Sequence, residues 1–321
     1  MKQQPRIIFF GTPFFALKPF EALIKNFSVV AAVTNPDERA GRSQAITPPP
    51  IKVFAEKYRI AILQPRKLPD IADTLRNFHA DAFVVAAYGK IIPKEILDIP
   101  RYGSLNIHPS LLPRWRGASP VQYTLLNGDI ETGVTVMLMD EKMDHGPILA
   151  NAKFKIQNAK LTTPELSEIL SNMGAELVTD TIPKWIHGEI TPTPQNESGA
   201  TYSTILKKED GRIDWSKSAV DIERRVRAFD PWPGSFTFWA IGDKKILVKV
   251  CESALVHETG SLWGDSRFQN GRVFIHDDGR MFVKTGDGIL EILRLQPEGR
   301  KNMSIKEFLN GYKEVSGAIF G

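Results

Sequence analysis

Residues 6–13 read Arg-Ile-Ile-Phe-Phe-Gly-Thr-Pro, and this stretch decides how the first half of the chain folds. The apolar run that ends at Gly11 is typical of a strand buried on both faces, as in a parallel sheet. Pro13 then suits the first turn of a helix, and helical spacing follows at 14–25. A second apolar run at 28–34 predicts the next strand. Strand, helix and strand in this order form a βαβ opening.

The same alternation continues along the chain. Further helices are expected at 50–58, 69–78, 93–97, 119–126 and 163–187. Further strands are expected at 60–64, 81–87, 102–107, 131–140 and 146–156, the last two antiparallel. This order predicts an α/β fold with a Rossmann-like, mostly parallel sheet. The opening lacks both the Gly-x-Gly-x-x-Gly fingerprint and a Walker A sequence, so neither a dinucleotide nor a nucleoside triphosphate is implied.

The second half of the chain differs in composition and in the length of its apolar runs. A segment rich in Thr, Pro, Gln and Asn is expected to be a linker at 189–207. Short alternating runs follow at 235–239, 246–252, 271–275, 280–285 and 289–295, between expected helices at 218–229 and 304–312. These runs predict a smaller OB-like β-barrel. We therefore expect a catalytic Rossmann-like domain at 1–188 and a barrel domain at 208–321.

Composition excludes several classes of protein. The chain has 321 residues, of which 42% are hydrophobic and 24% charged, as in ordinary globular proteins. Its single cysteine, Cys251, rules out an intramolecular disulfide and a cysteine-rich metal site. The first apolar run is too short for a signal peptide or a membrane span. We expect a cytoplasmic monomer without a membrane partner. The net charge of +4 is only a mild hint of an anionic partner.

Residues 106–120 carry the side chains best suited to chemistry: Asn-Ile-His-Pro-Ser-Leu-Leu-Pro-Arg-Trp-Arg-Gly-Ala-Ser-Pro. Asn106 and His108 should point to the same face, because side chains of a strand repeat every second residue. A further acid, Asp144, lies in the expected connection at 141–145. The turns at 11–12 and 88–89 also follow strands. Because ligands of parallel sheets sit beyond the carboxyl ends of strands, these features predict one site.

An asparagine amide and an imidazole on one face meet two needs of acyl transfer, which are stabilising an oxyanion and moving a proton. An acid beside the imidazole would fix its tautomer. No Gly-x-Ser-x-Gly elbow or other recognised nucleophile is present, which favours direct attack by the acceptor. His108 and His145 with Asp140 and Asp144 could be imagined as metal ligands. Their spacing does not support a metal site, and we expect none.

The same residues also have structural interpretations. Asn106 could cap the following turn, and Asp144 could form an Asx turn. Arg114 and Arg116 either contact RNA or, with the tryptophan between them, form a packed turn. The polar loop 35–50 is either a surface connection or an arm that seeks anions. The residues alone leave these alternatives open.

Three motifs together resemble the folate-dependent formyltransferase family. They are Asn106-Ile-His108, the run Ser110-Leu-Leu-Pro-Arg-Trp-Arg-Gly117 and Asp144-His-Gly-Pro147. Longer features resemble the members that formylate methionine on initiator tRNA. They are the run 110–122, the arm with Gly41-Arg42 and Pro48-Pro-Pro-Ile-Lys52, and the ending Pro297-Glu-Gly-Arg-Lys-Asn-Met303. The likeness covers nearly the whole chain.

The resemblance implies that 10-formyltetrahydrofolate is the donor and that the α-amine of methionyl initiator tRNA attacks the formyl carbon directly. Asn106 and His108 would stabilise the oxyanion and assist proton transfer, and Asp144 would tune His108. The implied folate-binding residues are Ser110, Leu111, Leu112, Pro113, Tyr88 and Gly89. The alternatives are formyl transfer to an amino-sugar nucleotide or to glycinamide ribonucleotide, or an RNA-binding relative without catalysis.

The resemblance also implies that the arm enters the acceptor end of the tRNA. The implied tRNA-binding residues of this region are Arg42, Arg39 and Lys52, with the barrel domain as a further tRNA-binding part. The arm reads Arg42-Ser-Gln-Ala where many relatives have Arg-Gly-x-Lys, so one basic residue is missing. Phosphate contacts should make binding depend on salt.

Overall fold

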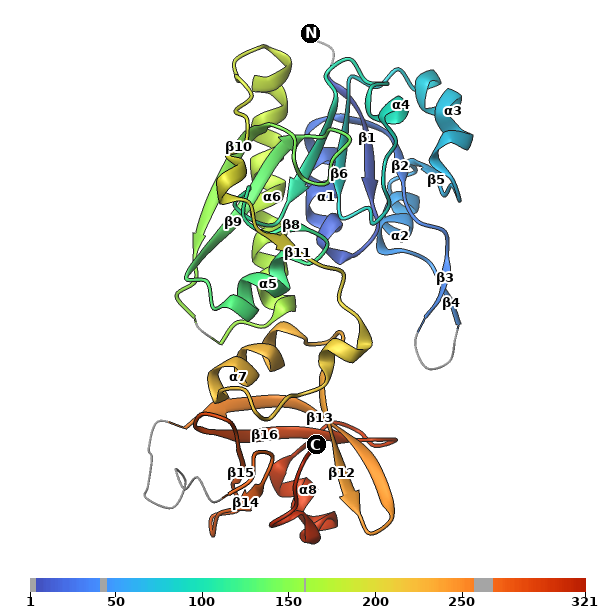
Figure 1. The fold of residues 1–321 in the computed structure, drawn as a ribbon. Helices are drawn as coiled ribbons and strands as arrows, with labels where there is room; N and C mark the ends of the chain where they lie inside the picture. The colour runs from blue at the N-terminus through green and yellow to red at the C-terminus, as the bar shows by residue number, and fades with distance from the viewer. Residues whose placement is uncertain (1–3, 41–44, 159, 257–267) are drawn as a thin grey trace. The chain divides into compact units, whose positions relative to one another are not determined.

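A seven-stranded sheet organises the first half of the chain in the computed structural model (Figure 1), which describes residues 4–40, 45–158, 160–256 and 268–321. The strand order is β10-β9-β7-β6-β1-β2-β5. The strands are β1 (Arg6–Gly11), β2 (Ser28–Val33), β5 (Ala61–Leu63), β6 (Ala82–Ala86), β7 (Ser104–His108), β9 (Glu131–Leu138) and β10 (Ile148–Lys155). The strands from β5 to β7 in this order run parallel, and β9 and β10 are antiparallel additions. The predicted mostly parallel sheet is confirmed.

Burial explains why these runs form strands. Every residue of β6 and β7 is buried, and so is β1 after its first residue. Such continuous apolar runs are typical of parallel strands covered on both faces. β10, at the edge, instead alternates between exposed and less exposed positions. Asn106 and His108 therefore lie on a strand in the interior of the sheet, because β7 pairs with β6 on one side and β9 on the other.

The helices connect and cover the strands. They are α1 (Leu17–Asn26), α2 (Pro50–Lys57), α3 (Ala72–Asn77), α4 (Lys94–Leu97), α5 (Pro120–Asn127) and α6 (Thr163–Ile186). Proline opens α2, as expected from its fixed φ. Gly174 of α6 lies so close to the sheet that an added Cβ would be 2.8 Å from Cγ2 of Ile107. The absence of a side chain at Gly174 thus lets α6 pack directly against β7.

A second, antiparallel sheet forms the last third of the chain, with strand order β12-β13-β16-β15-β14 and β17 beside β16. The strands are β12 (Ser235–Ile241), β13 (Lys244–Leu255), β14 (Val273–Ile275), β15 (Met281–Lys284), β16 (Ile289–Pro297) and β17 (Met303–Ser304). Helices α7 (Ala219–Ala228) and α8 (Ile305–Gly311) begin after the serine caps Ser218 and Ser304. This curled sheet is the expected barrel-like second part, so the predicted fold class is confirmed.

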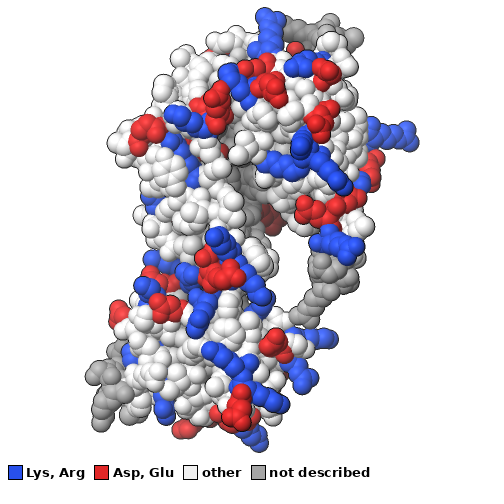
Figure 2. All heavy atoms as spheres, turned by 45° about the vertical axis from the view of Figure 1, so that its right-hand side comes forward, with Lys and Arg blue, Asp and Glu red and all other residues white. Residues whose placement is uncertain are grey.

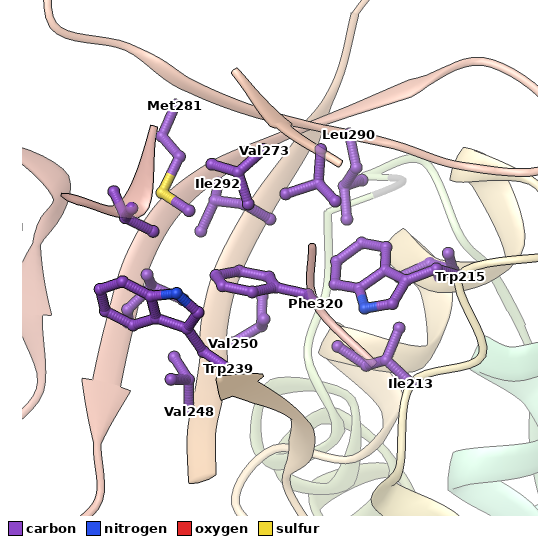
Figure 3. Packing of buried hydrophobic residues seen from close by; sticks show 14 of the residues in the cluster. Ile213, Trp215, Trp239, Val248, Val250, Val273, Met281, Leu290, Ile292 and Phe320 are labelled. Carbon is purple, nitrogen blue, oxygen red and sulfur yellow. The ribbon is translucent and has the colours of Figure 1, made fainter. Parts of the chain in front are cut away.

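The C-terminal residues fill the gap between the two edges of this curled sheet. Phe320 forms a bridge with Trp239 of β12, and Ile319 forms one with Arg272 before β14. The Phe320 ring is 6.2 Å from Trp215 and 6.5 Å from Trp239, centroid to centroid, inside the apolar core (Figure 3). The five predicted strands did not include this closing segment.

The chain divides into two compact units. The first comprises Met1–Pro120, Ile130–Gln157 and Leu166–Thr204, and the second comprises Val121–Asp129, Asn158–Glu165 and Ile205–Gly321. Most of the segment expected to be a linker thus belongs to the first unit, where β11 (Tyr202–Ser203) pairs with β8 (Arg116–Gly117). The expected ranges 1–188, 189–207 and 208–321 differ from these units.

The described part of the polar arm contains two strands where a loop was expected. β3 (Glu38–Ala40) and β4 (Ala45–Thr47) pair as an antiparallel hairpin. On the face drawn in Figure 2, Lys and Arg side chains are interspersed with Asp and Glu over both units, in keeping with the small net charge. No helix in the described ranges has both the length and the apolar character needed to cross a membrane.

Candidate functional site

Strand β7 presents Asn106 and His108 on one face, as the two-residue period predicts. Asn106 is 9% exposed and His108 4% exposed. Both belong to an interior strand, and His108 is its last residue, at the carboxyl edge of the parallel part of the sheet. Two polar side chains are therefore held on rigid backbone where ligands of α/β sheets bind.

The loop between β9 and β10 brings Asp144 to these two residues. One carboxylate oxygen, Oδ1, accepts a hydrogen bond from Nδ2 of Asn106 at 3.2 Å. The other, Oδ2, accepts the Gly117 N–H at 2.8 Å and lies 3.7 Å from Nδ1 of His108. Asp144 adopts a φ of 51°, a left-handed conformation that aspartate tolerates better than most residues. The structure thus joins the three residues on which the predicted chemistry depends.

The hydrogen bonds of His108 determine its tautomer. Nε2 lies 2.9 Å from the Trp115 carbonyl oxygen, which can only accept, so Nε2 carries a proton. In the neutral ring, Nδ1 is then the unprotonated nitrogen, and it faces the Asp144 carboxylate. A proton arriving at Nδ1 would be stabilised by that negative charge. The arrangement suits a group that accepts a proton from an attacking amine.

The turn after His108 is fixed from β9. Thr135 Oγ1 donates to the Ser110 carbonyl at 2.7 Å and accepts the Leu112 N–H at 3.1 Å. Ser110 Oγ donates to the Arg114 carbonyl at 2.5 Å. The predicted folate-binding residues 110–113 therefore form an ordered turn directly beside His108. The Leu112–Pro113 peptide bond is cis.

Tyr88 joins the site region through its backbone. Its carbonyl accepts hydrogen bonds from Thr12 Oγ1 and Asn35 Nδ2, both at 3.2 Å. The ends of β1, β2 and β6 are thereby tied together beside Gly89. The Tyr88 ring packs against Phe10, and burial raises the pKa of the phenol to about 12. The ring is part of the core, so the backbone at 88–89 is what faces the strand ends.

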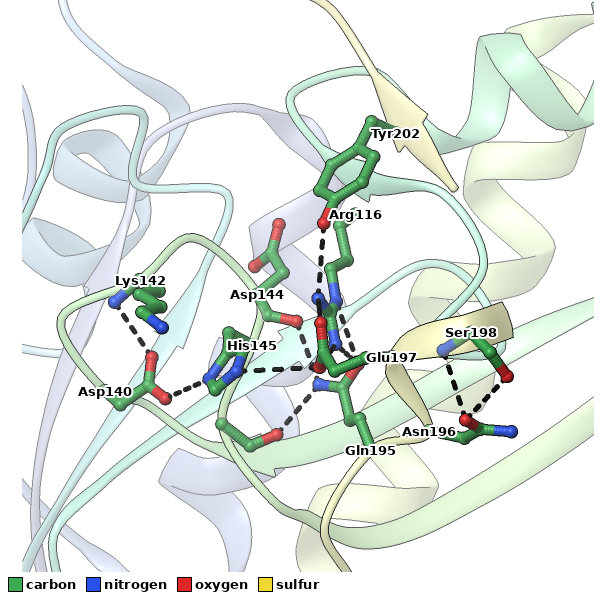
Figure 4. Close-up of polar contacts among 11 residues, drawn as sticks. Arg116, Asp140, Lys142, Asp144, His145, Gln195, Asn196, Glu197, Ser198 and Tyr202 are labelled. Atoms are coloured by element: carbon green, nitrogen blue, oxygen red, sulfur yellow. Dashed lines mark hydrogen bonds and ion pairs between the residues drawn. The ribbon is translucent and has the colours of Figure 1, made fainter. Parts of the chain in front are cut away.

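Arg116 is a structural residue and not an exposed contact for RNA. It is 2% exposed, and its guanidinium donates to Oε1 of Gln195 at 2.8 and 3.0 Å and to the Glu197 carboxylate at 2.7 and 3.0 Å (Figure 4). The hydrogen bond with Glu197 raises the pKa of Arg116, and the same bond lowers the pKa of Glu197. Arg114 stacks on Trp115 with 4.6 Å from Cζ to the ring centroid.

Gln195 connects this arginine to the Asp144 loop. Its Nε2 donates to the carbonyl oxygens of Asp144 and Gly146, each at 2.8 Å. His145, between these two, contacts Asp140 through Nδ1 at 2.6 Å and Glu197 through Nε2 at 3.5 Å. Reasoning from the sequence missed Gln195 and Glu197, because their segment has the composition of a linker.

The three predicted tRNA-binding residues belong to the arm and to α2, and neither of the two that the structure describes is part of the cluster around Asp144. Arg39 is exposed on β3. Lys52 on α2 forms an ion pair with Asp37 at 2.7 Å, and its side chain is 23% exposed. Arg42 falls outside the described residues. Among the residues that the structure describes, no group of three or more His, Cys, Asp or Glu side chains is placed to hold a metal ion.

Comparison of the chain with known proteins adds sequence evidence. Residues 5–182 match the family described as formyl transferase, and residues 205–313 match the formyl transferase C-terminal domain. The chain is 41% identical to the methionyl-tRNA formyltransferase of Myxococcus xanthus, over 98% of this chain and 97% of the relative. It is 40% identical to the methionyl-tRNA formyltransferase of Pseudoalteromonas translucida, over 100% and 99% of the two chains.

Solved structures show the same fold at lower identity. HypX from Aquifex aeolicus in complex with tetrahydrofolic acid has a TM-score of 0.62 at 17% identity, covering 97% of this chain. The chain spans about half of that protein, 47% of its length. An N-formyltransferase from Helicobacter canadensis, in complex with folinic acid and dTDP-3-aminofucose, has a TM-score of 0.63 at 20% identity. The alignment covers 90% of this chain and 98% of that one.

Proposed function

Because this chain belongs to the formyl transferase family, we propose that it transfers a formyl group to the α-amine of methionyl initiator tRNA. The donor is 10-formyltetrahydrofolate, and the product is N-formylmethionyl-tRNA for the start of translation. The support is a sequence likeness near 40% to methionyl-tRNA formyltransferases along the whole length of both chains. A tRNA acceptor implies a cytoplasmic protein, and we propose that it acts as a monomer.

The observation that carries the proposed chemistry is the contact of Asn106, His108 and Asp144. The amine attacks the formyl carbon, and negative charge develops on the formyl oxygen. Nδ2 of Asn106 has two hydrogens, of which one is used by Asp144, so the second is free to donate to that oxygen. Nδ1 of His108 takes the proton that the amine loses, and the Asp144 carboxylate stabilises the imidazolium. The bond between the formyl carbon and N10 of the folate then breaks, N10 receives the proton back from the imidazolium, and tetrahydrofolate leaves.

Apolar surface at the same edge of the sheet fits the two substrates. Phe14, after β1, is 77% exposed, and Ile91, after β6, is 82% exposed. Exposed apolar side chains beside polar groups are typical of a binding surface. They can take the pteridine ring of the folate or the methionine side chain. We propose that the ordered turn 110–113 and the backbone at 88–89 hold the folate.

The arm and the second unit are the proposed tRNA-binding parts. Arg39 and Arg42 on the arm, together with Lys52 at the start of α2, supply positive charge for phosphates of the acceptor end. Lys52 must share its charge with Asp37, to which it is bound. We therefore expect Arg39 and Arg42 to contribute more to tRNA affinity than Lys52.

Transfer to an amino-sugar nucleotide is the second candidate. The support is the shared fold of the sugar N-formyltransferases, at 20–21% identity. The chain is about 40% identical to methionyl-tRNA formyltransferases but only 20–21% identical to these sugar enzymes, which favours the tRNA acceptor. Glycinamide ribonucleotide as acceptor and an RNA-binding relative without catalysis are not favoured, because the relatives near 40% identity are methionyl-tRNA formyltransferases.

The deciding experiment measures formyl transfer from 10-formyltetrahydrofolate to charged initiator tRNA and to a dTDP-amino sugar in parallel. We expect transfer to the tRNA alone and a loss of at least about 100-fold in kcat for His108→Ala. His187→Ala is the matched control, because His187 is half exposed and its ion-pair partner is Glu189. Activity on the sugar alone would reject the proposed acceptor, and full activity of His108→Ala would reject the mechanism.

A second experiment tests the arm. Arg42→Ala should weaken the use of tRNA, seen as a higher KM and a smaller salt dependence, and leave folate binding unchanged. Arg66→Ala, an exposed arginine outside the arm, is the control. An equal loss of folate binding would contradict this division of roles.

A further inference from the structure

The segment 195–203 reaches back to the site through side chains and backbone. The Trp115 N–H donates to Thr201 Oγ1 at 2.8 Å, and the Arg116 N–H donates to the Thr201 carbonyl at 2.9 Å. β11 then continues as the partner of β8. This segment therefore holds the backbone on either side of Gly117, whose N–H binds Asp144.

The same segment holds the other side of Asp144. Both amide hydrogens of Gln195 are used, because its Nε2 donates to the carbonyls at positions 144 and 146. Its single acceptor, Oε1, is held by two N–H groups of Arg116. Arg116 in turn is fixed by Glu197. The side chain of Gln195 thus has a defined position and no spare hydrogen-bonding group directed elsewhere.

These contacts form a closed ring. From Asp144 the ring runs through its carboxylate to the Gly117 N–H, along the chain to Arg116, through the guanidinium to Gln195, and back to the Asp144 carbonyl. The loop adopts a left-handed φ at Asp144, a conformation disfavoured for side-chain-bearing residues, so it needs support from its surroundings. The ring provides this support on both sides of the residue.

We infer that Gln195 is a positioning residue for Asp144, and that the Arg116–Gln195 pair sets the distance between the Asp144 carboxylate and His108. Gln195 contributes by fixing the loop and takes no part in the reaction itself. This inference rests on the proposed formyl transfer for its effect on kcat. Its effect on the loop is independent of that function.

Gln195→Glu is the sharpest test. Glutamate keeps the acceptor oxygen for Arg116 but has no hydrogens for the carbonyls of Asp144 and Gly146. We expect kcat to fall by about 10-fold to 100-fold, because small misplacements of catalytic groups have effects of this size. KM for both substrates should stay within about twofold, since no substrate contact changes. Asn196→Asp is the matched control, because it makes the same change of amide to carboxylate one residue away and keeps the acceptor for Ser198.

Hydrogen exchange of the Gly117 amide gives a readout that needs no activity. Its N–H is bound to the Asp144 carboxylate, so displacement of the loop should speed its exchange by about threefold to tenfold. The Arg116 amide, bound to the Thr201 carbonyl, is the internal reference and should keep its rate. Gln195→Met, which has a similar length and no amide, should show the same acceleration at Gly117. Gln195→Met also replaces Gln195→Glu as the test variant if Gln195→Glu does not fold.

The outcomes separate the two proposals. Unchanged exchange at Gly117 in both Gln195 variants would overturn the positioning role, whatever the activity. Faster exchange at Gly117 with unchanged kcat would also overturn it, because the position of Asp144 would then not matter for transfer. If the wild-type protein formylates no tRNA but the Gln195 variants still show faster exchange at Gly117, the support of the Asp144 loop by Gln195 would stand. The proposed function would then be rejected instead.

Discussion

Replacing Asp144 with asparagine keeps the size of the side chain and removes its charge. In the structure, Oδ1 accepts from Asn106, and Oδ2 accepts from Gly117 and faces His108. The asparagine side chain has only one acceptor oxygen. Its NH2 group would therefore face either the Asn106 amide or the Gly117 N–H, both of which are donors. Whichever way the new amide turns, at least one hydrogen bond is lost.

The magnitude follows from the distances. A lost hydrogen bond to a charged group costs about 1.5–3 kcal/mol. The attraction between a carboxylate and an imidazolium separated by 3.7 Å is about 4–5 kcal/mol at an effective dielectric constant of about 20. These two figures bracket the loss of transition-state stabilisation. At about 1.4 kcal/mol per factor of ten, we expect kcat to fall by about 10-fold to 4,000-fold for Asp144→Asn.

Single-turnover formylation of methionyl-tRNA is the assay, with folate binding measured separately by fluorescence. Folate affinity should change by less than about threefold, because the carboxylate contacts protein groups. Asp140→Asn is the control, since Asp140 lies in the same loop and pairs with His145. A kcat of Asp144→Asn within about threefold of wild type would refute the assigned role of this carboxylate.

Three further predictions concern the scaffold. Phe320→Ala should lower the free energy of unfolding of the second unit by about 3–5 kcal/mol, whereas exposed Ile319→Ala should have little effect in denaturant titrations. Gly146→Ala would place a Cβ 1.9 Å from a backbone oxygen of β9, so formyl transfer should fall about tenfold or more, with Gly311→Ala as an unhindered control. The lowered pKa of Glu197 means that its stabilisation is present above its ordinary value of 4.5 and lost as pH falls through the folded-state pKa. Glu197→Gln should therefore destabilise the protein at neutral pH and less so at about pH 3, and equal losses at both pH values would contradict this assignment.

The predictable part of the fold is the part encoded by local periodicity. The apolar runs of β1 and β6 are strands because no other structure buries such runs so fully. The shared face of Asn106 and His108 follows from the two-residue period of a strand. The left-handed turn at Asp144 is compatible with the Asx-turn interpretation as well as with the functional one, and in the structure its carboxylate contacts the other two residues.

The unpredicted part depends on pairing between distant residues. Arg116 and Gln195 are 79 residues apart, and nothing in the periodicity of either segment indicates the other. Composition suggested a linker, because Thr, Pro, Gln and Asn are common in connections. The segment instead satisfies its polar groups against the site. The closure of the second sheet by residues 318–321 was missed for the same reason, since it is a contact between distant segments.

The pairing of β11 with β8 has a consequence for anyone recombining these enzymes. A chimera joined at residue 188, two residues after the end of α6, would combine one parent's Arg116 with another parent's residues at 195–203 and disrupt a matched set of contacts. Moving the junction to follow Thr204 keeps the pairing and its hydrogen bonds within one parent. Grafts of residues 205–321 onto a foreign N-terminal part should therefore be cut there.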